Sequence, residues 1–415
     1  MSYTLELGKN AKAAEALIAS AGTREKNNAL AAISKALLAN QDRIIAENAK
    51  DLEAAKANGM SEAKQDRLRL DADRIAGMAK GVDEIIMLGD PIGEVIDGFT
   101  RPNGLRIIKT RTSLGVIGII YESRPNVTVD AAALCLKAGN VVILKGGKEA
   151  IHSNVCLGAI MREAVASVGL PADVIQVVED TSRETTKELM RLNGYVDVII
   201  PRGSAGLIQA VVQNSTVPVI ETGAGNCHVY VDASADLDMA VEITDNAKTQ
   251  RPSVCNAIES LLVHKDCAEK FLPMIAERFK SHDVKIYGCD KTIAILGSGI
   301  EKAGETEYAT EFNDYIIAVK VVESLDEAIA HIRKYSTRHS ECIVTSSLES
   351  AERFQREVDA AAVYVNASTR FTDGGEFGFG AEIGISTQKL HARGPMGLRE
   401  LTTVKYLING NGQIR

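Results

Sequence analysis

Two apolar runs, Val116-Ile117-Gly118-Ile119-Ile120-Tyr121 and Val141-Val142-Ile143-Leu144-Lys145, decide the fold of this chain. Neither run alternates apolar with polar residues, so each is typical of a strand that is covered on both faces. Three more runs follow, and segments of helical length separate all five. The runs lie at 174–178, 196–200 and 217–221, and the helical segments at 129–138, 151–167, 183–192 and 205–214. Strands that alternate with helices predict an α/β protein with a doubly wound parallel sheet.

Sheets of this kind bind ligands at the carboxyl ends of their strands. The residues that follow the runs are therefore the first candidates for a functional site. They are the segments 122–126, 145–148, 201–204 and 221–225.

The rest of the chain divides around this sheet. A chain of 415 residues exceeds the size at which one core stops growing, so two domains are expected. Residues 1 to about 90 repeat apolar residues at spacings of three and four, which predicts helices of the scaffold. A second alternation of runs and helices fills 229–366. We therefore expect a first domain at 1–225, a second α/β domain at 226–385 and a C-terminal segment at 386–415.

Two further strands are predicted outside these domains. Asn103-Gly104 between alternating runs is a hairpin signal within 94–112, and residues 402–408 form another strand-like run. Unpaired strand edges tend to be covered by a partner, so we predict that both segments help to build a homo-oligomer. The alternative is a hairpin that folds back on its own subunit.

Cys255 is the candidate nucleophile. It lies in the segment Gln250-Arg251-Pro252-Ser253-Val254-Cys255-Asn256, directly before the apolar run 258–263. Because Pro252 biases Arg251 away from helix, the cysteine is expected on a constrained loop that enters a buried strand. A thiol there is fixed by the backbone, and the Arg251 cation would help to hold it as thiolate. The alternative is a cysteine that only fills space in the core.

The composition argues against several classes of protein. A formal net charge of −8 is unfavourable for nucleic acid and for anionic membranes as partners. The seven cysteines are scattered and contain no C-x-x-C pair, so neither disulfides nor a metal site is expected, and a reducing cytoplasm is the expected compartment. No apolar stretch reaches membrane-spanning length.

The residues at the strand ends resemble the aldehyde dehydrogenase superfamily in order and spacing. They are Asn126, Lys145, Gly203-Ser204 and Glu221-Thr222-Gly223, followed by Cys255. The segment 322–343, which reads VESLDEAIAHIRKYSTRHSECI, is similar to the signature of one branch, the gamma-glutamyl phosphate reductases of proline biosynthesis. The resemblance covers essentially the whole chain. It implies an aldehyde-dehydrogenase-like fold with a cofactor domain, a catalytic domain and a small oligomerisation hairpin, and it implies glutamate 5-kinase as a transient partner.

The resemblance implies a role for three catalytic residues. Cys255 would attack an acyl phosphate to give a thioester, while Asn126 and the Cys255 N–H would hold the oxyanion. Without the resemblance, Asn126 after Pro125 is equally a loop or cap residue. Glu221 corresponds to a glutamate that activates water in hydrolytic relatives. The following Thr222 and the residues after it depart from that pattern, so Glu221 is assigned to positioning or to generating the thiolate.

The cofactor contacts fall on the first domain. The chain lacks G-x-G-x-x-G, and the superfamily is similar in lacking it. By resemblance, Gly203 and Ser204 at a helix start would hold the pyrophosphate, Lys145 the adenosine ribose and Glu311 the nicotinamide ribose. Lys148 stands where NAD-using relatives have a glutamate, which favours a 2′-phosphate and hence NADPH. The alternatives are a plain strand-to-helix turn at Gly203 and Ser204, a solvated lysine at Lys148 and a surface carboxylate at Glu311.

Substrate contacts are expected from two places. Arg124 and Arg251 are candidates for the acyl phosphate because guanidinium matches phosphate geometry; surface ion pairs are the alternative. The glycine-rich segment 370–380 resembles the anchor loop of glutamate-semialdehyde-oxidising relatives. It implies that the Gly374 and Gly375 N–H groups bind an α-carboxylate, with Asp373 or Glu376 near an α-ammonium; a flexible surface loop is the alternative.

Together these features predict an NADPH-dependent reductase that converts L-glutamyl 5-phosphate to the semialdehyde through a Cys255 thioester. Two other hypotheses stay open. One is a hydrolytic NAD(P)-dependent aldehyde dehydrogenase, and the other is a non-catalytic protein in which Cys255 is inert.

Overall fold

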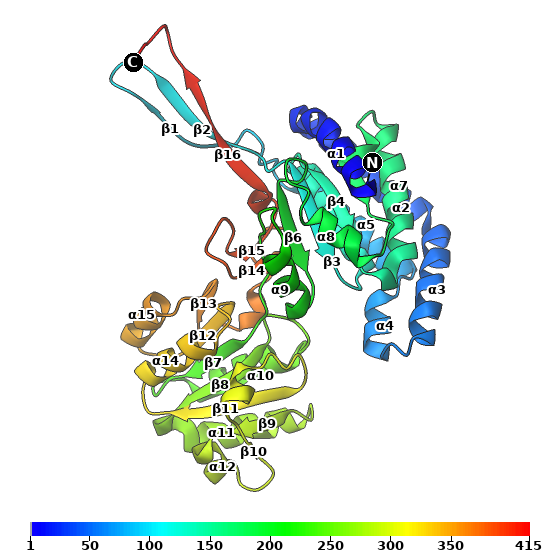
Figure 1. Ribbon diagram of the computed structural model, residues 1–415. Coiled ribbons are helices and arrows are strands. Elements are labelled where there is room, and N and C mark those ends of the chain that lie inside the picture. Colours follow the sequence, from blue (N-terminus) through cyan, green and yellow to red (C-terminus); the bar gives the residue numbers. More distant parts are fainter. Residues whose placement is uncertain (1) are drawn as a thin grey trace.

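The computed structural model describes residues 2–415, and it begins with five helices that pack beside the first sheet (Figure 1). On the second helix Leu30, Ile33 and Leu37 are fully buried, as their spacing of three and four requires. The Asp71 side chain accepts the N–H of Arg74 and so caps the fifth helix. The helices are α1 (Tyr3–Ser20), α2 (Thr23–Ala39), α3 (Gln41–Ala57), α4 (Glu62–Leu68) and α5 (Ala72–Met87).

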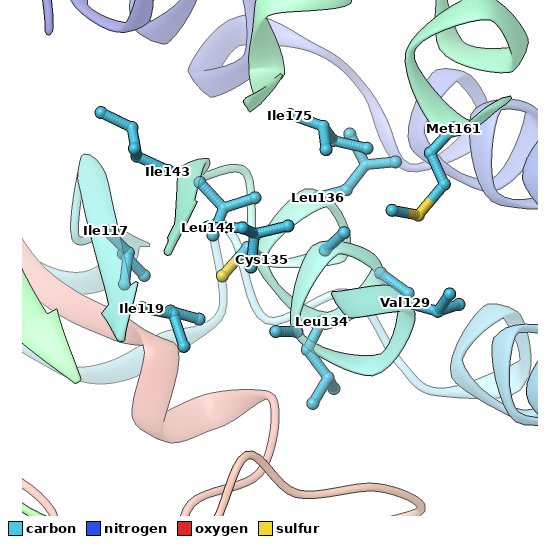
Figure 2. Close-up of a cluster of buried hydrophobic side chains, with 14 of the residues drawn as sticks. Ile117, Ile119, Val129, Leu134, Cys135, Leu136, Ile143, Leu144, Met161 and Ile175 are labelled. Carbon is cyan, nitrogen blue, oxygen red and sulfur yellow. The ribbon is translucent and has the colours of Figure 1, made fainter. Parts of the chain in front are cut away.

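The first sheet has four parallel strands in the order β5-β4-β3-β6. Its strands are β3 (Val116–Tyr121), β4 (Val141–Lys145), β5 (Ile175–Val177) and β6 (Val198–Arg202). Its other elements are α6 (Pro125–Lys137), η1 (Lys148–Ala150), α7 (Ile151–Ser167), η2 (Ala172–Val174), α8 (Arg183–Leu189) and α9 (Ala205–Asn214). Figure 2 shows Leu144 of the sheet beside Cys135 of α6, whereas Ile143 of the same strand points to the opposite face. The sheet therefore forms the main core and presents its carboxyl ends to one side.

The second sheet has seven strands in the order β10-β9-β11-β8-β7-β12-β13, and all its pairs are parallel. The strands are β7 (Cys227–Val231), β8 (Ile258–His264), β9 (Lys285–Gly288), β10 (Glu301–Lys302), β11 (Ile316–Val322), β12 (Ser340–Val344) and β13 (Ala362–Val365). The helices are α10 (Leu237–Thr249), α11 (Lys265–Lys280), α12 (Asp290–Leu296), α13 (Glu305–Ala309), α14 (Leu325–Tyr335), α15 (Leu348–Glu357) and η3 (Thr369–Phe371). Separate buried clusters lie on the two faces of this sheet.

A three-stranded antiparallel arm projects away from both sheets (Figure 1). It consists of β1 (Val95–Thr100), β2 (Arg106–Ser113) and β16 (Thr402–Asn409), with β2 in the middle. The short strands β14 (Ile385–Ser386) and β15 (Gly394–Pro395) and the helical turn η4 (Arg399–Leu401) lead into it.

The predicted α/β fold with parallel sheets is confirmed, and two local expectations were wrong. Residues 217–221 do not form a fifth strand, because Pro218 has no N–H to donate and only a single bridge joins Val219 to Ile199. The run at 402–408 is a strand, but it was expected to stand alone and instead pairs with β2 along its whole length.

Candidate active site

A cleft of about 860 Å³ opens beside the carboxyl ends of the first sheet and reaches the loop before β8. The residues that line it include Arg124, Arg202, Gly203, Ser204, Cys255 and Glu311. Arg67 of α4 and Arg124 also line a neighbouring cleft of about 490 Å³, so the two cavities adjoin. The fold thus brings the candidate nucleophile and most of the expected cofactor residues to one cavity.

A buried ion pair fixes the chain just after the loop that carries Cys255. The Lys248 Nζ lies 2.6 Å from the Glu259 Oε2, and the same Nζ donates to the Ile258 carbonyl at 3.0 Å. The other Glu259 oxygen accepts the N–H of Asn313 at 3.0 Å. Burial raises the pKa of Glu259 to about 7 and lowers the pKa of Lys248, although each charge favours the other. The pair joins the end of α10, the start of β8 and the loop that contains Glu311.

Gly225 lies directly behind the nucleophile. A Cβ at this position would lie 1.6 Å from the Cys255 carbonyl oxygen, so only glycine allows the two backbones to approach as they do. The Gly225 N–H donates to Glu311 Oε1 at 2.7 Å. Glu311 is therefore tied to the segment that supports Cys255, and it faces the main cleft.

Cys255 is half-buried at the wall of the main cleft. Burial raises the pKa of its thiol to about 11, the positive charge of Arg202 acts in the opposite direction, and the carboxylates of Glu382 and Glu311 add to the rise. The thiol is therefore protonated at neutral pH in the free protein. Arg202 had no role in the sequence prediction beyond its place at a strand end, and the structure makes it the cation that favours the thiolate.

Arg124 lies among other arginines at the start of α6. Burial and the positive charges of Arg202, Arg67 and Arg251 lower its pKa to about 10. Arg251 lines the smaller cleft and Arg124 lines both clefts. Four guanidinium groups close to one another attract an anion, as expected for a site that binds an acyl phosphate.

Two predicted catalytic residues do not line the wall that Cys255 occupies. Asn126 is exposed at the start of α6, its Nδ2 donates to Asp130 Oδ2 at 3.1 Å, and it lines the smaller cleft. The Glu221 N–H donates to Gln388 Oε1 at 3.4 Å, and its neighbours Thr222 and Gly223 line the main cleft. To act next to Cys255, the side chain of Asn126 or of Glu221 would have to adopt a different position.

The residues expected to bind the cofactor are divided, because Gly203, Ser204 and Glu311 line the main cleft whereas Lys145 and Lys148 do not. Ser204 caps α9, but its N–H and hydroxyl both donate to the Glu122 carboxylate, at 2.8 and 2.9 Å. Lys145 is buried at the end of β4, where burial lowers its pKa against the attraction of Asp180 and Glu149. Lys148 is exposed on η1. A carboxylate on the α9 N-terminus shows that this position accepts an anion, and it is the position expected for the pyrophosphate.

The glycine-rich segment lies apart from the lining of both clefts. The Gly374 N–H donates to Glu382 Oε2 at 2.9 Å, and the Gly375 N–H donates to Asp373 Oδ1 at 2.8 Å. Both donors are already used by carboxylates of the protein. Binding of a substrate carboxylate there would require Glu382 and Asp373 to release them.

Residues 2–415 contain neither a cluster of side chains suited to a metal ion nor a helix suited to a membrane. Within that range no group of three or more His, Cys, Asp and Glu side chains is placed to hold a metal ion. In the same range no helix is both long and apolar enough to cross a membrane.

Residues 5–304, which include the Cys255 loop and most of the cleft, match the model of the aldehyde dehydrogenase family. The chain belongs to the aldehyde dehydrogenase family. Membership makes it an enzyme of the oxidoreductase class and implies a nicotinamide cofactor.

Close relatives of this aldehyde dehydrogenase carry one name. A gamma-glutamyl phosphate reductase of Clostridium perfringens is 60% identical over 408 residues, which cover 98% of this chain and 98% of the relative. Another, of Clostridium novyi, is 59% identical over 414 residues and covers 100% and 99% of the two chains. The crystal structure of a gamma-glutamyl phosphate reductase from Thermotoga maritima matches with a TM-score of 0.98 and 50% identity over 100% of both chains. These relatives confirm the predicted branch of the family.

A more distant member shares only the fold. An acetylating aldehyde dehydrogenase from Geobacillus thermoglucosidasius is 18% identical, with a TM-score of 0.70 over 99% of this chain and 97% of the other. The architecture is therefore common to family members whose sequences have diverged widely.

Proposed function

We propose that this enzyme reduces L-glutamyl 5-phosphate to L-glutamate 5-semialdehyde and phosphate with NADPH, the second step of proline biosynthesis from glutamate. The observation that carries the proposal is a cysteine at the wall of a cleft that Arg67, Arg124 and Arg202 line, with Arg251 in the adjoining cleft. The name of relatives that are 60% identical supports the substrate. Such a site combines a nucleophile with the cations that an acyl phosphate requires.

The chemistry divides into two stages at the Cys255 sulfur. The thiolate attacks the acyl carbon, a C–S bond forms, and the C–O bond to phosphate breaks with its electron pair leaving on the phosphate. Arg124 and Arg251 would bind the phosphate, and Arg202 would stabilise the thiolate before the attack. In the second stage the tetrahedral hemithioacetal at Cys255 collapses, the C–S bond breaks, and the sulfur returns to thiolate.

The bound cofactor would supply the hydride that reduces the thioester. The residues fit such a group, because the α9 N-terminus already holds a carboxylate and two lysines lie at the ends of neighbouring elements. Lys145 would contact the adenosine ribose, Lys148 the 2′-phosphate, Gly203 and Ser204 the pyrophosphate, and Glu311 the nicotinamide ribose. Glu122 would have to release Ser204 when the pyrophosphate binds.

The reverse reaction tests the substrate and the nucleophile. Oxidation of the semialdehyde with NADP⁺ should depend on phosphate in the wild type and should be lost in Cys255→Ser, while Cys289→Ser, at a half-buried cysteine elsewhere, keeps it. Oxidation at full rate without phosphate would instead support a hydrolytic aldehyde dehydrogenase. Near-native turnover by Cys255→Ser would rule out the thioester.

The cofactor preference has its own test at Lys148. Lys148→Glu should shift the ratio of kcat/KM values from NADPH toward NADH, because a carboxylate repels the 2′-phosphate and accepts from a 2′-hydroxyl. Lys35→Glu, on the exposed face of α2, is the matched control. An unchanged preference in Lys148→Glu would remove this lysine from the cofactor site.

The arm is the proposed contact between subunits of a homo-oligomer. Its strands β1 and β16 have unpaired outer edges, and apolar side chains such as Phe99 (49% exposed) and Ile408 (59% exposed) face solvent in the single chain. Ile408→Glu should lower the mass that sedimentation velocity measures. An unchanged mass would exclude the arm as the contact.

A further inference from the structure

The smaller cleft contains Arg124, Asn126 and Arg251, which the sequence assigned to the reacting acyl phosphate, and further charged residues to which the sequence assigned no role. It lies between α4, α5 and the start of α6, and the N-terminal helices that form much of it were expected to be scaffold. Five arginines and two aspartates line it: Arg67, Arg69, Arg74, Arg124, Arg251, Asp66 and Asp130. Charged side chains of both signs therefore face one cavity of about 490 Å³.

Most of these charges lack a partner in the protein. Arg74 forms an ion pair with Asp66 at 2.8 Å, so these two charges neutralise each other. Within residues 2–415 no ion pair is found for the side chains of Arg67, Arg69, Arg124 or Arg251. Like charges gathered without a counterion destabilise the free protein, and an anionic ligand relieves that cost.

Asp130 supplies a negative charge on the same cavity. Its Oδ2 accepts from the neutral amide of Asn126, and it forms no ion pair within the described chain. Burial raises its pKa to about 6, against the hydrogen bond from Asn126 and the attraction of Arg202. A carboxylate here would repel a phosphate and would attract an ammonium group.

A cavity with unpaired cations and a separate unpaired carboxylate matches a zwitterion. A phosphate alone would need only the arginines, whereas the α-amino acid end of a glutamyl compound carries a carboxylate and an ammonium together. The cavity also adjoins the nucleophile, because Arg67 and Arg124 line both clefts and Cys255 lines the larger one. A ligand held at one end in the smaller cleft can therefore extend toward the sulfur.

We propose that the part of the smaller cleft between α4 and α6 binds the α-amino acid end of the substrate, with Arg67 contacting the α-carboxylate and Asp130 accepting a hydrogen bond from the α-ammonium, while Arg124 and Arg251 keep the phosphate. This assignment rests on the proposed function and refines it. It replaces the Gly374 and Gly375 donors, which carboxylates of the protein already use. It makes α4 and the start of α6 the elements that select the substrate.

Three aldehydes that differ only in charge test the assignment in the phosphate-dependent oxidation. L-Glutamate 5-semialdehyde carries both charges, 5-oxopentanoate carries only the carboxylate, and pentanal carries neither. Asp130→Asn should reduce the preference for the semialdehyde over 5-oxopentanoate by about tenfold or more, since it removes one charged hydrogen bond. Arg67→Gln should reduce the preference for 5-oxopentanoate over pentanal by a similar factor.

The controls separate this site from the phosphate site. Asp83→Asn on α5 and Arg24→Gln on α2 change the same charges at exposed positions outside both clefts and should leave all three preferences unchanged. The KM for phosphate should stay within twofold of wild type in every variant. If Arg67→Gln raised only the KM for phosphate, Arg67 would be a phosphate ligand and the assignment would be overturned. Unchanged preferences among the three aldehydes would also overturn it.

Equilibrium binding distinguishes failure of this assignment from failure of the proposed function. Calorimetry with L-glutamate and with glutarate needs no turnover, so it reports on the cleft even in an inactive variant. L-Glutamate should bind more tightly than glutarate in the wild type and lose that advantage in Asp130→Asn. A wild type without phosphate-dependent oxidation refutes the proposed function, whereas equal binding of the two acids refutes the cleft.

Discussion

Replacement of Gly225 by alanine should inactivate the enzyme without unfolding it. The new Cβ would lie 1.6 Å from the Cys255 carbonyl oxygen and 2.6 Å from the Cys255 Cα, whereas ordinary contact begins at about 3.4 Å. The Cys255 loop must therefore retreat by well over 1 Å. The Lys248–Glu259 pair fixes the chain just beyond that loop, so the displacement falls on the nucleophile itself.

The size of the loss follows from the precision that catalysis needs. A misplacement of about 1 Å costs roughly 100-fold in rate, which corresponds to about 2.7 kcal/mol. We expect kcat of Gly225→Ala to fall by at least about that factor, with the KM for NADPH changed much less, because the expected nucleotide contacts lie on the first sheet. Steady-state kinetics in both directions, with circular dichroism to confirm folding, measures both quantities.

Gly89→Ala is the matched control, because a Cβ there meets nothing within 4 Å and its backbone does not require glycine. It should keep wild-type kinetics. A folded Gly225→Ala enzyme with more than one tenth of the wild-type kcat would show that the position of the Cys255 backbone does not limit the reaction.

Two further predictions concern charge. The rate of Cys255 alkylation by iodoacetamide in the free enzyme should rise about tenfold per pH unit through neutral pH, because a pKa of about 11 leaves the thiol protonated there. Arg202→Met should lower this rate at each pH by about tenfold, because the variant lacks the cation that favours the thiolate. An equal rate in the variant would exclude Arg202 as the stabilising cation. Lys248→Met should cost about 3–5 kcal/mol of stability in denaturant unfolding near pH 8.5 and less near pH 6. Lys248 lowers the pKa of Glu259, so its removal raises that pKa above the wild-type value of about 7 and further above the unfolded value. Both proteins carry a protonated Glu259 well below pH 7, and only the variant is penalised as the pH rises above it; a deficit that does not depend on pH would contradict this account.

The strands of the core could be predicted wherever burial on both faces removes polar residues. β3 and the first four residues of β4 are continuous apolar runs, and their positions in the structure follow the sequence closely. β7 gave no such signal, because it contains His228, whose Nδ1 lies 2.9 Å from the Glu341 Oε2 on the neighbouring strand. A buried polar pair makes a core strand resemble a surface strand until both partners are known.

Site residues could be predicted from the sequence only where their positions depend on residues nearby in the chain. Cys255, Gly203 and Ser204 lie on local loops and strand ends, so motif spacing could single them out as candidates, and all three line the main cleft. Arg67 had no local signal, because its place at the clefts depends on how α4 packs against elements that are distant in sequence. The use of Glu122 at the α9 N-terminus depends in the same way on the pairing of β3 with β6.

The pairing of β2 with β16 also sets an order of events during translation. Roughly 300 residues separate the paired strands, so a ribosome working at 5–20 residues per second needs roughly 15 to 60 s to deliver the partner of β2. Once β6 has been made, the first sheet has all its own strands, but β2 still has only β1 beside it until β16 follows about 200 residues later. The nascent enzyme therefore exposes an open edge while its first sheet is already complete, and chaperones that recognise unpaired strands would act on the arm first.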